Sequence, residues 1–187
     1  MVQRKSNKKA WEALTKKRDE YRVLAGWFEQ SKYSNGASIG GIAAVQNYGA
    51  KIPVTDKLRG WFGANYNIHF RKSTQYLIIP PTHFMENCQK QNAEKWKAAF
   101  LKAWGSVFAG EATAEKALDI AGQLIAGDIS QAIADVSAPP LSSLTIKMRL
   151  GGYADNNKKI PTNTGLGKRL THTGEMGLAV NHKVEKK

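Results

Sequence analysis

The stretch "ENCQKQNAEKWKAAFLKAWGSVFAGEATAEKALDIAGQLIAGDISQAI", residues 86–133, decides the fold of this chain. In its first half, bulky apolar residues recur at steps of three or four, which is the spacing of one face of an α-helix. This first stripe consists of Ala93, Trp96, Phe100, Trp104 and Val107. Gly110 is expected to end the helix, because glycine is the preferred residue just past a helix C-terminus.

The second half of the stretch predicts another amphipathic helix. Thr113 is a suitable N-cap, and Glu115 places a negative charge in the first turn, where it favours the helix dipole. The second apolar stripe consists of Leu118, Ala121, Ile125, Ile129 and Ile133. Two such helices with a short connection predict a helical hairpin.

The residues before this hairpin predict a helix, a strand and a second, shorter helix. Residues 8–22 have a narrow apolar stripe at helical spacing, and residues 21–30 are rich in aromatic and aliphatic residues typical of a strand. Asn35-Gly36 predicts a turn. Ser38 is a suitable N-cap for a helix that begins at Ile39 and stops at Gly49.

Residues 50–79 predict a helix followed by a β-hairpin. The helix is expected after Thr55 as its N-cap. The hairpin arms are residues 68–70 and 76–79, and Pro80-Pro81 ends the second arm because proline cannot donate to a strand ladder.

After the helical hairpin, Ser142 is expected to cap a short helix at 143–149, and residues 178–184 alternate as a strand. The whole pattern predicts an α+β protein, a small, mainly antiparallel sheet packed against a long helical hairpin. We expect residues 1–20 to be a basic N-terminal helix or arm. Residues 21–187 are expected to form a single domain with a flexible, polar and glycine-rich loop at 151–167.

The composition of the 187-residue chain favours a polyanionic or acidic partner. Lysine and arginine number 28 against 15 acidic residues, which gives a formal net charge of +13. Such a charge favours contact with polyanions. No apolar run reaches the roughly 18 residues that a membrane span needs. Cys88 is the single cysteine, so an internal disulfide is excluded and assembly in a cytosol fits.

The sequence lacks a recognisable catalytic or metal-binding pattern. His83 and Cys88 are five residues apart, and His172 and His182 are ten apart. Neither spacing matches paired ligands such as CxxC or HExxH. No GxSxG nucleophile elbow and no GxxxxGK[ST] loop occur. We therefore expect no metal, no cofactor and no enzymatic activity.

Nucleic-acid contact remains a serious interpretation of the charge. Basic residues lie next to aromatic ones in "WFGANYNIHFRK", residues 61–72, as in surfaces that stack bases. No named DNA-binding motif accompanies them. Candidate contacts with a protein partner or with DNA are the basic residues of the two ends, namely Arg4, Lys5, Lys8, Lys9, Lys158, Lys159, Lys168 and Arg169.

Five segments, in order, resemble the virion-morphogenesis or tail-completion proteins of tailed bacteriophages. They are "AGWFEQSKYSNG" (25–36), "IGGIAAVQNYG" (39–49), "IIPPTHFM" (78–85), "PPLSSLTIKMR" (139–149) and "KRLTHTGEM" (168–176). The resemblance covers nearly the whole chain, from about Tyr21 to Val184. It assigns structural roles to Pro80, Phe84, Thr173 and Gly174.

The chain departs from the family pattern at several of these positions. Asn47 stands where the family commonly has glutamate. Thr82 and His83 replace Arg-Pro, and Thr171 and His172 replace Ile-Asp. If the family residues fasten one subunit to the next, this chain must use other contacts.

The resemblance implies a structural virion protein of the head–tail junction, a neck or tail-completion protein that is assembled in the host cytoplasm. Such a protein would form a cyclic ring, a hexamer or dodecamer, around the DNA conduit. Its partners would be copies of itself and neighbouring neck, tail-terminator or connector proteins, with non-specific contact to packaged DNA. Two alternatives stay open, a tail terminator that caps the tube and a basic, non-specific DNA-binding accessory protein.

Overall fold

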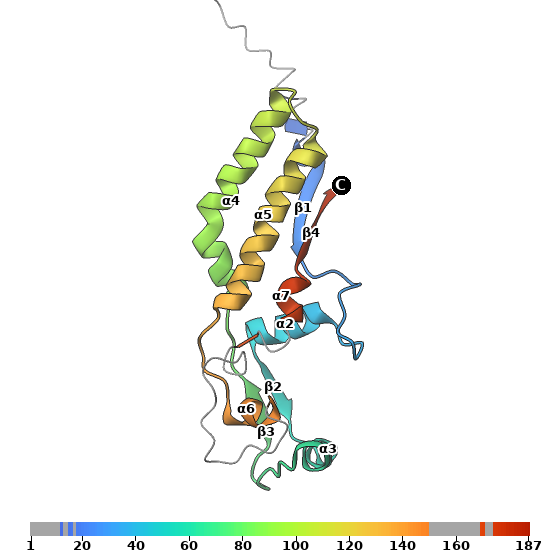
Figure 1. The fold of residues 1–187 in the computed structure, drawn as a ribbon, viewed down its shortest axis with the longest axis vertical. Coiled ribbons are helices and arrows are strands. Elements are labelled where there is room, and N and C mark those ends of the chain that lie inside the picture. Colours follow the sequence, from blue (N-terminus) through green and yellow to red (C-terminus); the bar gives the residue numbers. More distant parts are fainter. Residues whose placement is uncertain (1–11, 13–14, 17, 150–168, 171–173) are drawn as a thin grey trace, which may run out of the picture. The chain divides into compact units, whose positions relative to one another are not determined.

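The computed structural model describes residues 12, 15–16, 18–149, 169–170 and 174–187. Helices and short antiparallel strands alternate along these residues, so the predicted α+β class is confirmed (Figure 1). The chain forms two compact units. Unit 1 comprises Met1–Gly26, Gln89–Ile129 and Val180–Lys187, and unit 2 comprises Trp27–Cys88 and Ser130–Ala179. Each unit is described by itself below, and the single domain expected at 21–187 stays a prediction.

Unit 1 joins the two ends of the chain to the predicted helical hairpin. Strand β1 (Tyr21–Gly26) pairs antiparallel with β4 (Asn181–Lys186). The hairpin consists of α4 (Phe84–Phe108) and α5 (Ala114–Asp135), and Figure 1 shows the two strands running alongside α5. The buried centre is formed by Ala103, Ala117 and Leu118, against which pack Tyr21, Val23, Phe100, Trp104, Val107, Ala112 and Val184.

The β1–β4 sheet has one face toward the helices and one toward solvent. Val23 and Val184 lie opposite each other in the register and contact the core, as expected from the two-residue period of a strand. On the other face, hydrogen bonds from Lys183 and Arg22 lower the pKa of the Glu185 carboxyl. Of these contacts only Arg22–Glu185 crosses between the strands, and both lie at the surface, so the core face provides most of the stability of the sheet.

A glycine allows β4 to approach α5 closely. Gly122 is buried in α5, and a Cβ atom at this position would lie 2.5 Å from the His182 ring and 3.0 Å from the Val23 side chain. The ring itself is held by a 2.8 Å contact between His182 Nε2 and a carboxylate oxygen of Asp119, also on α5. Because only glycine leaves this space, Gly122 sets the distance between strand and helix.

Unit 2 contains the remaining elements. They are α2 (Ile39–Tyr48), β2 (Ala50–Pro53), α3 (Asp56–Tyr66), β3 (Tyr76–Ile79), α6 (Ser143–Arg149) and α7 (Glu175–Leu178). The predicted caps are confirmed, because the side chains of Ser38, Thr55 and Ser142 accept hydrogen bonds from the backbone at Gly41, Leu58 and Thr145. The described residues before β1 (12, 15, 16, 18 and 19) are helical, also as predicted.

The predicted hairpin between residues 68–70 and 76–79 is wrong. Strand β3 pairs instead with β2, so that Ala50 lies opposite Ile79. The backbone carbonyls of Phe70, Arg71 and Thr74 accept hydrogen bonds from the Arg59 guanidinium of α3, and Phe70 packs edge-on against Phe62. These contacts hold residues 68–74 against α3, away from a strand ladder.

The predicted strand at 178–184 is shifted along the chain. Residues Glu175–Leu178 form the short helix α7, and β4 begins only at Asn181. The expected loop at 151–167 lies outside the described residues. Within the part of the chain that the structure describes, every helix is too short or too polar to cross a lipid bilayer.

Candidate functional site

The C-terminus of α2 and the N-terminus of α4 satisfy each other's unpaired backbone groups. The last carbonyls of a helix lack partners within the helix. Here the Gln46 carbonyl accepts from the backbone N–H of Thr82 at 3.1 Å and from its hydroxyl at 2.9 Å. The Asn47 carbonyl accepts from the His83 N–H at 3.0 Å. Residues 82–83, which lead into α4, thus complete the end of α2.

Asn47 completes the arrangement in the other direction. Its side chain is almost fully buried, at 2% exposed. Oδ1 accepts a hydrogen bond from the backbone N–H of Met85 at 3.0 Å, so it satisfies one of the free donors of the first turn of α4. Nδ2 donates to both carboxylate oxygens of Glu86, at 3.1 and 2.9 Å. We call this set, Gln46, Asn47, Thr82, His83, Met85 and Glu86, the reciprocal cap.

Trp27 ties two further segments to the reciprocal cap. Its ring packs edge-on against Phe84, the first residue of α4, with ring centroids 6.2 Å apart. Its indole Nε1 donates to the Met176 carbonyl in α7 at 2.8 Å. The Trp27 side chain therefore connects the start of α4 with α7 inside unit 2.

Arg169 connects the two proline-rich segments. Its guanidinium donates to the Pro139 carbonyl at 2.7 Å and to the Pro80 carbonyl at 3.1 Å. With these bonds, all five segments that carry the phage resemblance meet within unit 2. Segments up to 149 residues apart in sequence, as between Trp27 and Met176, are thus in direct contact.

Two departures from the family pattern, at Asn47 and His83, have local explanations, and those at Thr171 and His172 lie outside the described residues. A glutamate in place of Asn47 would bring a second carboxylate to Glu86, whereas the asparagine amide donates to it. His83 has a φ of 51°, which proline cannot adopt because its ring fixes φ near −65°. A proline would also lack the N–H that bonds to the Asn47 carbonyl. In this chain, the Asn47 side chain fits the Glu86 carboxylate, and the His83 N–H fits the Asn47 carbonyl.

The sequence-predicted residues have different outcomes. Phe84 is buried at 2% exposed, Pro80 accepts from Arg169, and Gly174 has a φ of 74° at the start of α7, so each has a structural position in the described part of the chain. Arg169 is itself 6% exposed, and its contact with a partner or with DNA stays a prediction. The other candidates, Arg4, Lys5, Lys8, Lys9, Lys158, Lys159, Lys168 and Thr173, lie outside the described residues.

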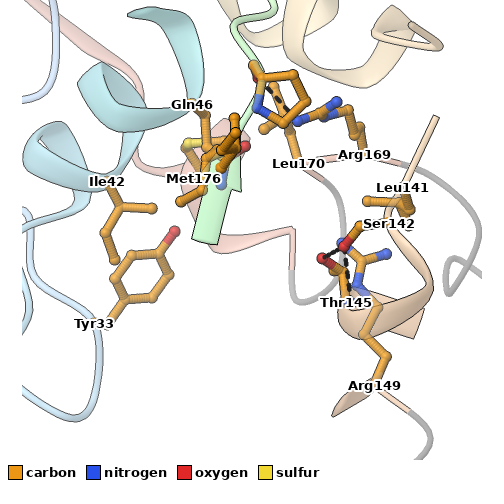
Figure 2. A pocket seen from close by; sticks show the side chains of 13 residues that line it. Tyr33, Ile42, Gln46, Leu141, Ser142, Thr145, Arg149, Arg169, Leu170 and Met176 are labelled. Atoms are coloured by element: carbon orange, nitrogen blue, oxygen red, sulfur yellow. Dashed lines mark hydrogen bonds between the residues drawn. The ribbon is translucent and has the colours of Figure 1, made fainter. Parts of the chain in front are cut away.

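A cleft of about 310 Å³ adjoins the reciprocal cap. Figure 2 shows Tyr33, Ile42, Gln46 and Met176 on one side, and α6 with Leu141, Ser142, Thr145 and Arg149 on the other. Arg169 and Leu170 lie at its end, and Ile78, Ile79 and Pro80 of the β3 segment complete the lining. Among the described residues that line this cleft, aliphatic side chains predominate and none is acidic.

The electrostatic environment of the cleft is positive. Burial lowers the pKa of both Arg149 and Arg169, because removal from water disfavours the charged form. Arginine nevertheless stays protonated in proteins, so both remain cations. Burial, and secondly the negative charge of Glu175, raise the pKa of the Tyr33 hydroxyl, which therefore stays a neutral donor at pH 7.

The remaining polar groups of interest are occupied in ordinary contacts. His69 contacts the Asn67 side chain, and His182 contacts Asp119. Cys88 is a buried thiol that takes part in no disulfide. Within the described residues, no group of three histidine, cysteine, aspartate or glutamate side chains is placed to hold a metal ion.

Sequence patterns did not reveal the residues that organise this site. Asn47 looks like an ordinary polar residue before a helix-ending glycine, and Tyr33 and Arg149 belong to motifs without an individual role. The signal that was present is the order of the five segments, which pointed to a shared structural purpose. Comparisons with protein-family models, with curated proteins and with solved structures give no match for this chain. The phage resemblance therefore depends on these five segments alone.

Proposed function

We propose that this chain is a structural virion protein at the head–tail junction of a tailed phage, a neck or tail-completion protein that forms part of a ring around the DNA conduit. One observation carries the proposal, namely that the five segments on which the resemblance depends meet in one place. Trp27, Asn47, Thr82, Arg169 and Met176 come from four of these segments, and each contacts another of the five. Segments that matched a family pattern by chance would have no reason to converge.

The sheets supply surfaces suited to a ring. Each of the two sheets has two strands among the described residues, so every strand keeps one edge without a partner strand. Such edges can accept a strand from another chain. A closed ring needs two different, complementary surfaces on each subunit. The open strand edges are candidates for these surfaces.

The proposal is tested in a phage that encodes this chain, by interrupting the gene. We expect DNA-filled heads and separate, complete tails to accumulate, because the proposed junction cannot form. Adding the purified protein to the extract should restore infectious particles by several orders of magnitude. Heads and tails that join normally without the protein would contradict the proposal.

The same experiment separates the junction protein from a tail terminator. A cap on the tube would limit tube growth, so its loss should give tails of irregular length. A junction protein leaves tail length unchanged. Gold-labelled antibody against the chain, viewed by negative-stain microscopy, should mark the neck of complete particles, and label at the end of headless tails would favour the terminator.

A basic surface in unit 2 favours non-specific DNA contact as a second candidate function. Lys57, Arg71 and Lys72 are exposed around α3, and none has an ion-pair partner among the described residues. Trp61 on α3 is 46% exposed and offers a stacking surface. Together they combine the two features of sequence-independent DNA binding.

DNA affinity measured against salt concentration tests this second candidate. Each neutralised phosphate contributes a slope of about −0.9 to log K against log salt. We expect a Lys57→Ala, Lys72→Ala variant to lower the magnitude of the slope by about 2, since each lysine contributes about 1. Lys97→Ala serves as the control, because Lys97 lies on α4 beside Glu94. An unchanged slope in the double variant would remove α3 from the DNA-binding surface.

A further inference from the structure

The cleft beside the reciprocal cap holds a buried cation that has no counter-ion among the residues that the structure describes. Arg169 is 6% exposed, and its guanidinium bonds to the carbonyls of Pro80 and Pro139. No carboxylate of the described residues forms an ion pair with it, and its Nε has no hydrogen-bond partner. A buried charge is costly unless it is paired, and two carbonyl dipoles compensate it only in part.

Part of the cleft lining leaves aliphatic surface exposed. Ile78 on β3 is 72% exposed and Ile42 on α2 is 37% exposed, although both line the cleft. Large aliphatic groups beside a concave, positively charged surface are typical of a site that another chain covers. Figure 2 shows Tyr33 beside Ile42 with its hydroxyl toward Met176, which adds a neutral donor to this part of the lining.

We propose that this cleft binds a peptide segment of another protein that carries a carboxylate next to aliphatic side chains, with the carboxylate facing the guanidinium groups of Arg169 and Arg149 and the aliphatic groups against Ile42 and Ile78. The inference depends on the geometry of unit 2 alone and does not require the proposed phage function.

Charge and lining favour this occupant over the alternatives. Arginine forms bidentate bonds with planar carboxylates, and no acidic residue among the described lining residues competes for them. A nucleic-acid backbone would contact aliphatic side chains, which have no charge and no hydrogen-bond donor for its phosphates. A second copy of this chain brings a net charge of +13 to a positive site, which opposes its approach.

The test uses two synthetic tripeptides, acetyl-Leu-Glu-Leu-amide and acetyl-Leu-Gln-Leu-amide, titrated into the ¹⁵N-labelled full chain and followed by NMR. We expect the glutamate peptide to bind about tenfold more tightly, because a hydrogen bond to a charged group exceeds a neutral one. Signals of Ile79, Thr145 and Arg169 should shift. Equal affinity of the two peptides would overturn the proposal.

Variants connect the binding to the cleft. Arg149→Gln and Ile78→Ser should each weaken the glutamate peptide at least fivefold. Leu101→Ser is the matched control for Ile78→Ser, because Leu101 is 67% exposed on α4 and should leave affinity unchanged. Arg169→Gln is a less direct probe, since it removes the bonds to Pro80 and Pro139. Tight binding that survives both cleft variants would place the peptide elsewhere.

Three further measurements address other occupants. Inorganic phosphate that displaces the glutamate peptide would identify a general anion site and overturn the peptide assignment. Sedimentation of the chain as a dimer that Ile78→Ser converts to a monomer would identify a second copy as the occupant. Asp155 is the one acidic residue between Arg149 and Arg169 in the sequence, and tighter peptide binding by Asp155→Asn would show that this chain fills its own cleft.

Discussion

Replacing Asn47 with aspartate is expected to destabilise unit 2 by about 3 kcal/mol at pH 7, because it brings a second carboxylate to Glu86 in a buried site. The Nδ2 group that donates to both Glu86 oxygens would be lost, and two negative charges would lie within hydrogen-bond distance. The bond from the Met85 N–H to Oδ1 would remain possible. Urea denaturation followed by circular dichroism measures the change.

The destabilisation caused by Asn47→Asp should become smaller as the pH falls. Two carboxyl groups that share a site raise the pKa of one of them in the folded state. A raised folded pKa stabilises the fold below the unfolded value of about 3.9, and this stabilisation is lost as the pH rises through the folded pKa. The difference between Asn47→Asp and the unchanged chain should therefore be smaller at pH 4 than at pH 7.

Asn35→Asp is the matched control for this substitution. The Asn35 side chain only accepts, from the Ala37 N–H at 3.0 Å, and it is exposed. An aspartate keeps this acceptor, so stability should change by less than about 0.5 kcal/mol. If Asn47→Asp were as harmless as the control at pH 7, the Asn47–Glu86 contact would not exist in solution.

Gly122→Ala is expected to destabilise unit 1 by about 2 kcal/mol, since the added methyl group overpacks the contact between α5 and β4. The new Cβ would lie 2.5 Å from the His182 ring, which cannot retreat without losing its contact with Asp119. Alanine favours a helix over glycine by about 1 kcal/mol, so the observed value is the net of two opposing effects. Hydrogen exchange at the Arg22 and Leu24 amides, which bond to β4 in this register, reads the β1–β4 sheet directly.

Gly127→Ala provides the control in the same helix. A Cβ at this exposed position meets no atom within 4 Å. Only the helix preference changes, and the substitution should stabilise the chain by about 0.5–1 kcal/mol. A loss of stability at Gly122 and a gain at Gly127, five residues apart, would separate the effect of packing from that of helix propensity. A gain of stability at both positions would show that β4 does not approach α5 as described.

Local patterns in the sequence were sufficient for most of the helices. The stripes and the caps at Ser38, Thr55, Thr113 and Ser142 act within a few residues of each other, and they predicted α4, α5 and these caps correctly. Ala93 of the first stripe is nevertheless exposed, and Ala103, outside the stripe, is buried. The strand predicted at residues 68–70 was wrong. The Arg59 side chain binds the carbonyls of Phe70, Arg71 and Thr74, and no hydrophobic pattern reports such a contact.

The candidate site was less accessible to sequence reasoning. Asn47 and Glu86 are 39 residues apart, and the bond between them depends on how α2 and α4 meet. Arg169 was predicted as a surface contact with a partner or DNA, yet burial and two carbonyl partners define its position. Such contacts between distant polar groups have no period or spacing, so they become visible only in the folded chain.

The pairing of β1 with β4 affects how the molecule is made. Arg22 and Glu185, which face each other across this sheet, are separated by 163 residues. During synthesis, a ribosome therefore adds 163 residues after Arg22 before it reaches Glu185. Val23 and Leu24 remain without their partner strand β4 during that time, as is usual for contacts of long sequence separation. The β1–β4 sheet of unit 1 can thus close only after β4 has been synthesised.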